Sequence, residues 1–159
     1  MFKTGKNIPI AFEEIPQALL NFYNRNKEFE SQMSIIIGTD SQNFSDTKMV
    51  SVIAMICEGR GGIFFYEVSH LNLIKNIKQK LQTETGESLN LATRLIDMLE
   101  SKEDYIDMFT DCLFAIHVDA SNNDKGKTKA LIPELVGWIK ACGYDVKTKP
   151  VVPSYAIVT

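Results

Sequence analysis

The chain has 159 residues, of which 45% are hydrophobic and 23% charged, and its formal net charge is −3. This composition is typical of a folded protein with one core and excludes wholesale disorder. The acidic balance argues against a protein that coats nucleic acid, although it leaves room for a local basic groove. No apolar run approaches the ~20 residues that cross a bilayer, and no apolar signal segment follows the N-terminal lysines. We therefore expect a cytoplasmic protein without a membrane partner, built as a single domain over residues 1–159.

The N-terminal half predicts one helix followed by three strands. Apolar residues recur at helical spacing over residues 15–29. The three apolar segments that follow are separated by short polar or glycine-rich turns, and they predict an antiparallel meander with strands at residues 34–40, 49–57 and 63–68. The continuous isoleucine run of the first strand is typical of a central strand that is buried on both faces.

The C-terminal half predicts two helices, each followed by a strand. A long helix is expected at about residues 71–101, weakened at Gly86, and a second at 127–142 with Gly143 as its stop. The strands that follow them are expected at 113–119 and 144–149. Crossovers that contain helices make these strands parallel to the first. The predicted fold class is α/β, a ribonuclease H-like mixed five-stranded sheet with helices on both faces and an extra N-terminal helix.

Two aspartates end strands that we expect to be parallel neighbours. Asp40 ends the first strand and Asp119 the fourth, so the two carboxylates can converge at one end of the sheet. Two carboxylates at such a short separation repel each other unless a cation lies between them. Oxygen ligands favour Mg²⁺ or Mn²⁺, so this pattern indicates a divalent metal site. The alternative is that each aspartate only terminates its strand as a turn or cap residue.

Glu84 is the expected third carboxylate. It follows Ile77 by seven residues and Leu81 by three, which places it on the inward face of the long helix. A buried carboxylate needs a partner, and the metal site would supply one. The alternative is an exposed or capping role near Gly86. Glu87, one turn further on, is a weaker candidate.

Lysines near the second crossover support a rival interpretation. Residues 121–128 match the phosphate-binding pattern G-x-x-x-x-G-K-[ST], except that Ser121 replaces the first glycine. Lys125 and Lys127 could therefore bind a nucleoside triphosphate, attract phosphate groups near the metal site, or begin a solvated helix. The cysteines Cys57, Cys112 and Cys142 are widely spaced with no C-x-x-C pair, which favours buried free thiols.

Two blocks of sequence resemble one known family. Gly38-Thr39-Asp40-Ser41-Gln42 resembles the opening motif of the YkuK-type ribonuclease H-like family of bacterial proteins. The block Ile116-His117-Val118-Asp119, followed by Lys125-Gly126-Lys127-Thr128 and Glu134-Leu135-Val136-Gly137-Trp138, is similar to the same family. The resemblance extends from the N-terminal helix to Tyr155 and implies the fold together with a nuclease-type metal site.

The resemblance also implies roles for individual residues. Asp40, Glu84 and Asp119 fit the catalytic carboxylates that hold two Mg²⁺ or Mn²⁺ ions for phosphodiester hydrolysis of RNA or DNA, with Asp40 bridging ions ~3.5–4 Å apart. Nucleic acid is the expected partner, and the expected substrate contacts are Ser41, Gln42, Lys125 and Lys127. A further carboxylate usually comes from a C-terminal helix. The sequence stops at Thr159 before such a residue, so either the chain is shortened or this ligand is lacking. A binding module that retains the fold without catalysis is the alternative.

Overall fold

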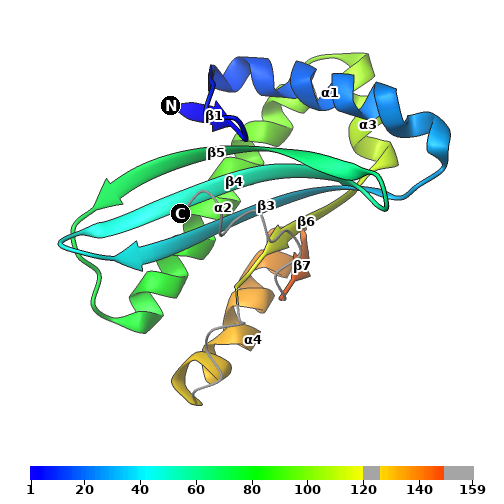
Figure 1. Ribbon diagram of the computed structural model, residues 1–159. Coiled ribbons are helices and arrows are strands. Elements are labelled where there is room, and N and C mark those ends of the chain that lie inside the picture. Colours follow the sequence, from blue (N-terminus) through cyan, green and yellow to red (C-terminus); the bar gives the residue numbers. More distant parts are fainter. Residues whose placement is uncertain (120–125, 149–159) are drawn as a thin grey trace.

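Three long strands form the centre of the sheet in the computed structural model, which describes residues 1–119 and 126–148 (Figure 1). They are β3 (Met33–Asn43), β4 (Thr47–Cys57) and β5 (Gly61–Leu71). Short turns join them, and each pairs antiparallel with the next along its whole length. The predicted meander is therefore confirmed. Its strands are longer than the apolar segments of the sequence.

The sheet has seven strands in the described part of the chain, in the order β2-β1-β5-β4-β3-β6-β7, rather than the predicted five. The additional strands are β1 (Phe2–Thr4) and β2 (Pro9–Ile10), which form a hairpin against β5. They were not predicted because two or three residues are too few to establish an alternating pattern. Their pairing depends on the neighbouring strand instead of on local sequence.

The two C-terminal strands run parallel to β3, as the crossover argument requires. β6 (Leu113–His117) pairs with β3, and β7 (Asp145–Lys147) pairs with β6. The last pair joins His117 to Gly38, so no described strand lies beside residues 39–43 of β3 on that side. This open edge begins one residue before Asp40.

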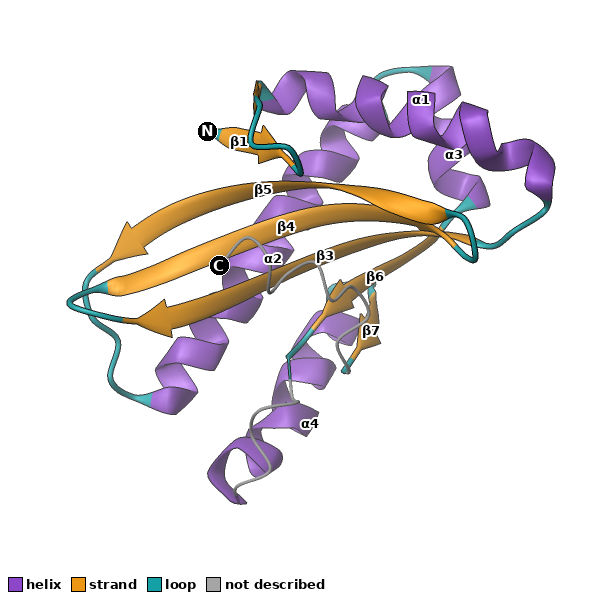
Figure 2. Cartoon of the chain, viewed as in Figure 1, coloured by secondary structure: helices purple, strands orange, loops and turns teal. Residues whose placement is uncertain are grey.

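The described helices all contribute to the core on one face of the sheet. They are α1 (Ile15–Asn26), α2 (Ile77–Leu99), α3 (Glu103–Asp111) and α4 (Gly126–Ala141), with short 3₁₀ turns at Phe12–Glu14 and Lys27–Phe29. Figure 2 shows α2 crossing behind the three long strands. The core contains buried side chains from every helix and from the strands, including Leu19, Leu95, Met108, Ile139, Ile35 and Ile53.

The prediction of helices on both faces is not met within residues 1–119 and 126–148. The opposite face has its own smaller cluster, made of Val50, Val52, Ala54 and Tyr66, to which no described helix contributes. Both faces of β3 are nevertheless buried, since Ile35 and Ile37 are 0% exposed and Ile36 is 1% exposed. The isoleucine run thus correctly indicated two buried faces but did not determine what covers each of them.

One helix start and one whole helix differ from the sequence expectation. α2 begins at Ile77 rather than near residue 71, because the Asn76 side chain caps it by accepting a hydrogen bond from the Gln79 amide at 3.0 Å. The acidic stretch after α2 forms the helix α3, which was not predicted. Its inward side chains are Tyr105 and Met108. Two apolar positions among many carboxylates gave little periodic signal.

Candidate functional site

The three predicted carboxylates line one small cavity. Its volume is about 130 Å³, and it lies where β3 passes the end of β6 and the first turns of α2. Asp40 belongs to β3, Glu84 belongs to α2, and Asp119 follows β6. The remaining lining residues are Ser41, Ile77, Lys80 and Leu81. The convergence predicted from two strand ends and one helix face is therefore seen in the structure.

Two hydroxyl contacts fix α2 over the end of β3. Ser88 on the helix donates a hydrogen bond to the Thr39 hydroxyl at 2.8 Å, and one helical turn earlier the Ser41 hydroxyl donates to the Glu84 carboxylate. All four side chains are buried. Polar side chains placed in an otherwise apolar contact can pair in only one register, so these bonds hold Glu84 at a defined height above Asp40.

The pKa of Asp40 is raised above its ordinary value of 3.8. Burial is the largest cause, and repulsion from the Asp119 carboxylate adds to it. A hydrogen bond from the Ser41 amide at 2.9 Å and attraction to the Lys80 ammonium act in the opposite direction without cancelling the rise. Desolvation and like charge thus both oppose ionisation at this position.

Glu84 is affected more strongly, because only 8% of it is exposed. Burial raises the pKa of Glu84 from 4.5 to about 8. The Ser41 hydrogen bond lowers this pKa, as Lys80 does, whereas the charges of Asp40 and Asp119 raise it further. The cavity therefore contains more acidic groups than it can ionise at neutral pH without an added cation.

The donor set suits a divalent cation in its chemistry. Three carboxylates supply only oxygen ligands, which hard cations such as Mg²⁺ and Mn²⁺ prefer. In the arrangement seen, however, no group of three acidic, histidine or cysteine side chains within residues 1–119 and 126–148 is placed to hold a metal ion. Glu84 is engaged by the Ser41 hydroxyl instead. Asp40, Asp119 and Glu84 are thus the residues that would hold a cation, and Glu84 would have to exchange its partner.

The structure places the other predicted site residues in different surroundings. Ser41 lies in the cavity, but its hydroxyl is directed to Glu84. Gln42 is exposed and does not line the cavity. Glu87 is exposed, so its weaker candidacy is not supported. Residues 121–125 of the phosphate-loop pattern, Lys125 among them, and the side chain of Lys127 lie outside what the structure describes.

Lys80 was not among the site residues predicted from the sequence, yet it lines the cavity. The signal that could have identified it is its position four residues before Glu84, where side chains on one helix face are neighbours. Its ammonium group lowers the pKa of both Asp40 and Glu84. Lys80 is therefore the cation already associated with the acidic cluster.

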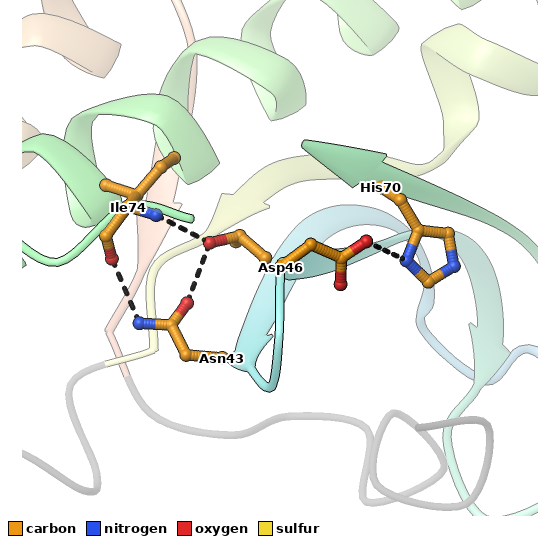
Figure 3. A network of polar contacts seen from close by, with 5 residues as sticks. Asn43, Asp46, His70 and Ile74 are labelled. Carbon is orange, nitrogen blue, oxygen red and sulfur yellow. Dashed lines mark hydrogen bonds and ion pairs between the residues drawn. The ribbon is translucent and has the colours of Figure 1, made fainter. Parts of the chain in front are cut away.

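A ring of hydrogen bonds ties the β3–β4 turn to the segment before α2 (Figure 3). The Asn43 amide donates to the Ile74 carbonyl at 2.9 Å, and the Ile74 amide donates to the Thr47 hydroxyl at 2.8 Å. The Thr47 hydroxyl closes the ring by donating to the Asn43 side-chain oxygen at 2.8 Å. Beside it, the His70 ring contacts the Asp46 carboxylate at 3.0 Å. The β3–β4 turn and the segment that leads into α2 are therefore one connected unit.

The thiols do not form part of the site. Cys57 and Cys112 are buried and free, as expected, and burial raises the pKa of Cys112 to about 12. Cys142 is free but exposed, which corrects the expectation that all three are buried. It lies just after the last residue of α4, beyond the helical stripe that faces the core. Among the described residues, no helix combines the length and the hydrophobicity needed to cross a membrane.

Comparisons with known proteins agree with the geometry. The family model described as "Ribonuclease H-like" matches residues 14–156. An uncharacterized protein from Bacillus subtilis (strain 168), YkuK, is 30% identical over 157 residues, a match that covers 94% of this chain and 89% of the relative. No solved structure gave a significant match.

Proposed function

Since the chain belongs to the ribonuclease H-like family, we propose that it is a metal-dependent nuclease that hydrolyses phosphodiester bonds in RNA or DNA. The single observation that supports this proposal most directly is the convergence of Asp40, Glu84 and Asp119 on one cavity. Each carboxylate comes from a different element, so the cluster is not a by-product of local sequence. Burying mutually repelling acids without a cation is unfavourable, which favours a site adapted to bind one.

Each residue of the cavity has a role in this proposal. Asp40 and Asp119 would hold Mg²⁺ or Mn²⁺, with Glu84 as a third ligand once it is released from Ser41. Bound divalent ions supply an activated water and stabilise the leaving oxygen in phosphodiester hydrolysis. Lys80 places a positive charge beside the position of the scissile phosphate. Until a cation binds, Glu84 keeps its proton up to about pH 8, which limits repulsion within the cluster.

The rival proposal is a nucleic-acid-binding module without turnover. The observation that favours it is the absence, in the described ranges, of a ready-made group of three metal ligands. The two proposals differ in the role of the cation. A nuclease requires the cation for cleavage, whereas a binding module keeps its affinity in chelator and never cleaves.

The test combines metal binding with cleavage. Mn²⁺ affinity is measured by isothermal titration calorimetry for the wild type and for Asp40→Asn, with Glu87→Gln as the control because it removes an exposed carboxylate near the site. We expect Asp40→Asn to weaken Mn²⁺ binding by at least about tenfold, since losing even an outer-shell partner costs ~10–100-fold. The control should bind as the wild type does.

Cleavage of labelled RNA, DNA and RNA–DNA hybrid is then followed with Mg²⁺, with Mn²⁺ and with chelator. The proposal predicts cation-dependent cleavage that Asp40→Asn abolishes and Glu87→Gln preserves. Cleavage that survives Asp40→Asn would refute the assigned site. Mn²⁺ binding that is unchanged in this variant, with no cleavage of any substrate, would favour the binding module.

A further inference from the structure

We propose that Phe44, held at the tip of the β3–β4 turn, stacks on an unpaired base next to the carboxylate cavity, and that Lys75 and Lys78 contact the phosphates beside that base. The inference rests on the proposed function and makes it more specific. It makes the substrate a single-stranded nucleic acid, or one that is unpaired where it enters the site. The sequence motifs assigned no such contact to Phe44, Lys75 or Lys78.

Phe44 is unusually exposed for a phenylalanine. Its side chain is 63% exposed, more than any other large hydrophobic residue described except the N-terminal Met1 at 76%. It occupies a three-residue turn, where the Phe44 amide donates to the Asp46 carbonyl at 2.8 Å. A single exposed apolar side chain is common on protein surfaces, so the inference depends on where this ring lies and on the charges beside it.

The structure anchors the turn that carries this exposed ring. Asn43 on one side of the turn and Thr47 on the other both bond to Ile74, in the ring of hydrogen bonds shown in Figure 3. Thr47 is 0% exposed, so these bonds are protected from water. A ring carried by an anchored turn leaves only its own side-chain torsions to be ordered when a base stacks on it.

Phe44 lies near the cavity. It follows Ser41 by three residues, which is about 10 Å along an extended strand. Its anchor, Ile74, precedes the cavity-lining Ile77 by less than one helical turn. Figure 1 shows the β3–β4 turn and the start of α2 at the same end of the molecule. A strand whose phosphate occupies the cavity would therefore pass this turn.

Positively charged side chains lie on the segment that leads into α2 and on its first turn. Lys75 and Lys78 are exposed on the segment that Asn43 anchors and on the first turn of α2, and neither forms an ion pair among the described residues. Lys80 continues the series into the cavity. An exposed ring flanked by cations is the arrangement that single-stranded nucleic acid prefers, because bases stack on the ring while phosphates meet the lysines. The bases of an intact duplex are already stacked on each other and are not available to Phe44.

The test measures binding of fluorescein-labelled oligonucleotides in chelator, where no cleavage occurs. Three probes share one sequence: a single strand, the same strand with abasic residues, and a blunt duplex. The variants are Phe44→Ala, the conservative Phe44→Trp, and the control Phe29→Ala, which removes an exposed phenylalanine before the opposite end of β3.

We expect Phe44→Ala to weaken single-strand binding by about 5- to 150-fold, the range found for one base–aromatic stack. Binding of the abasic strand and of the duplex should change little. Phe44→Trp should retain tight binding, and Phe29→Ala should match the wild type. Equal single-strand affinities for the wild type and Phe44→Ala, or an abasic strand that binds the wild type as tightly as the intact one, would overturn the inference.

The outcomes also separate this inference from the proposed function. Cation-dependent cleavage with no effect of Phe44→Ala on single-strand binding leaves the nuclease standing and removes the stacking role. A base-dependent effect of Phe44→Ala in a protein that cleaves nothing supports the binding surface and counts against catalysis.

Discussion

The buried Glu84 carboxylate makes the stability of the protein fall as pH rises. Its pKa is about 8 in the folded protein and close to its ordinary value of 4.5 in the unfolded chain. Between these values the folded state holds a proton that the unfolded state has released, so the free energy of unfolding decreases with increasing pH. The decrease begins near pH 4.5 and ends above pH 8. At 1.36 kcal/mol per pH unit, the interval between the two pKa values corresponds to up to about 5 kcal/mol.

Urea unfolding at a series of pH values from 5 to 8 checks this prediction. Glu84→Gln keeps the size of the side chain and can still accept the Ser41 hydrogen bond, but it cannot ionise. Subtracting the variant from the wild type removes contributions from most other titrating groups. The wild type should therefore lose stability relative to Glu84→Gln as the pH rises. A difference between the two proteins that is constant from pH 5 to pH 8 would show that Glu84 is not held neutral by burial.

Three other substitutions test packing and hydrogen bonding by urea unfolding. Gly86→Ala should stabilise the protein by ~0.5–1 kcal/mol, because glycine is unfavourable inside a helix and the added Cβ would lie an ordinary 3.5 Å from its nearest neighbour. A loss of stability in this variant would contradict the prediction. Gly62→Ala should destabilise by ~1–3 kcal/mol, since its Cβ would lie 2.7 Å from the Met55 carbonyl oxygen, and an unchanged midpoint would count against the tight fit. Thr47→Val should cost ~1–3 kcal/mol by leaving the buried Ile74 amide unpaired, and a change within ~0.5 kcal/mol would mean that the ring is dispensable.

The carboxylate cluster was predictable because each member follows a simple periodicity. Asp40 and Asp119 follow apolar runs that must form parallel strands when helices connect them, so they come to the same end of the sheet, although β3 continues to Asn43 and β6 stops at His117. Glu84 follows Leu81 by three residues, which sets it on the helix face that packs inward. These arguments need only local pattern and chain order, and both are present in the sequence.

The missed features depend on contacts between distant parts of the chain. The strand β2 has two residues and exists because β1 lies beside it. Asn76 caps the late start of α2, and the residues before it bond to the β3–β4 turn, a contact that no local propensity encodes. The exposure of Phe44 was equally hidden, since a phenylalanine in a polar turn looks the same in sequence whether it folds inward or outward.

The arrangement of β3 between β4 and β6 has a consequence for the order of folding. β3, β4 and β5 pair through short turns, so their ladders form from local contacts with little loop-closure entropy. Between β3 and β6 the chain contains β4, β5, α2 and α3. Pairing β3 with β6 therefore closes a long loop, and we expect it to form later. We therefore expect the amides of the meander to be protected early in pulsed hydrogen exchange and those of β6 late. Asp119 would then join the other two carboxylates at the last stage, so their repulsion opposes the closing step of assembly and leaves the early steps unaffected.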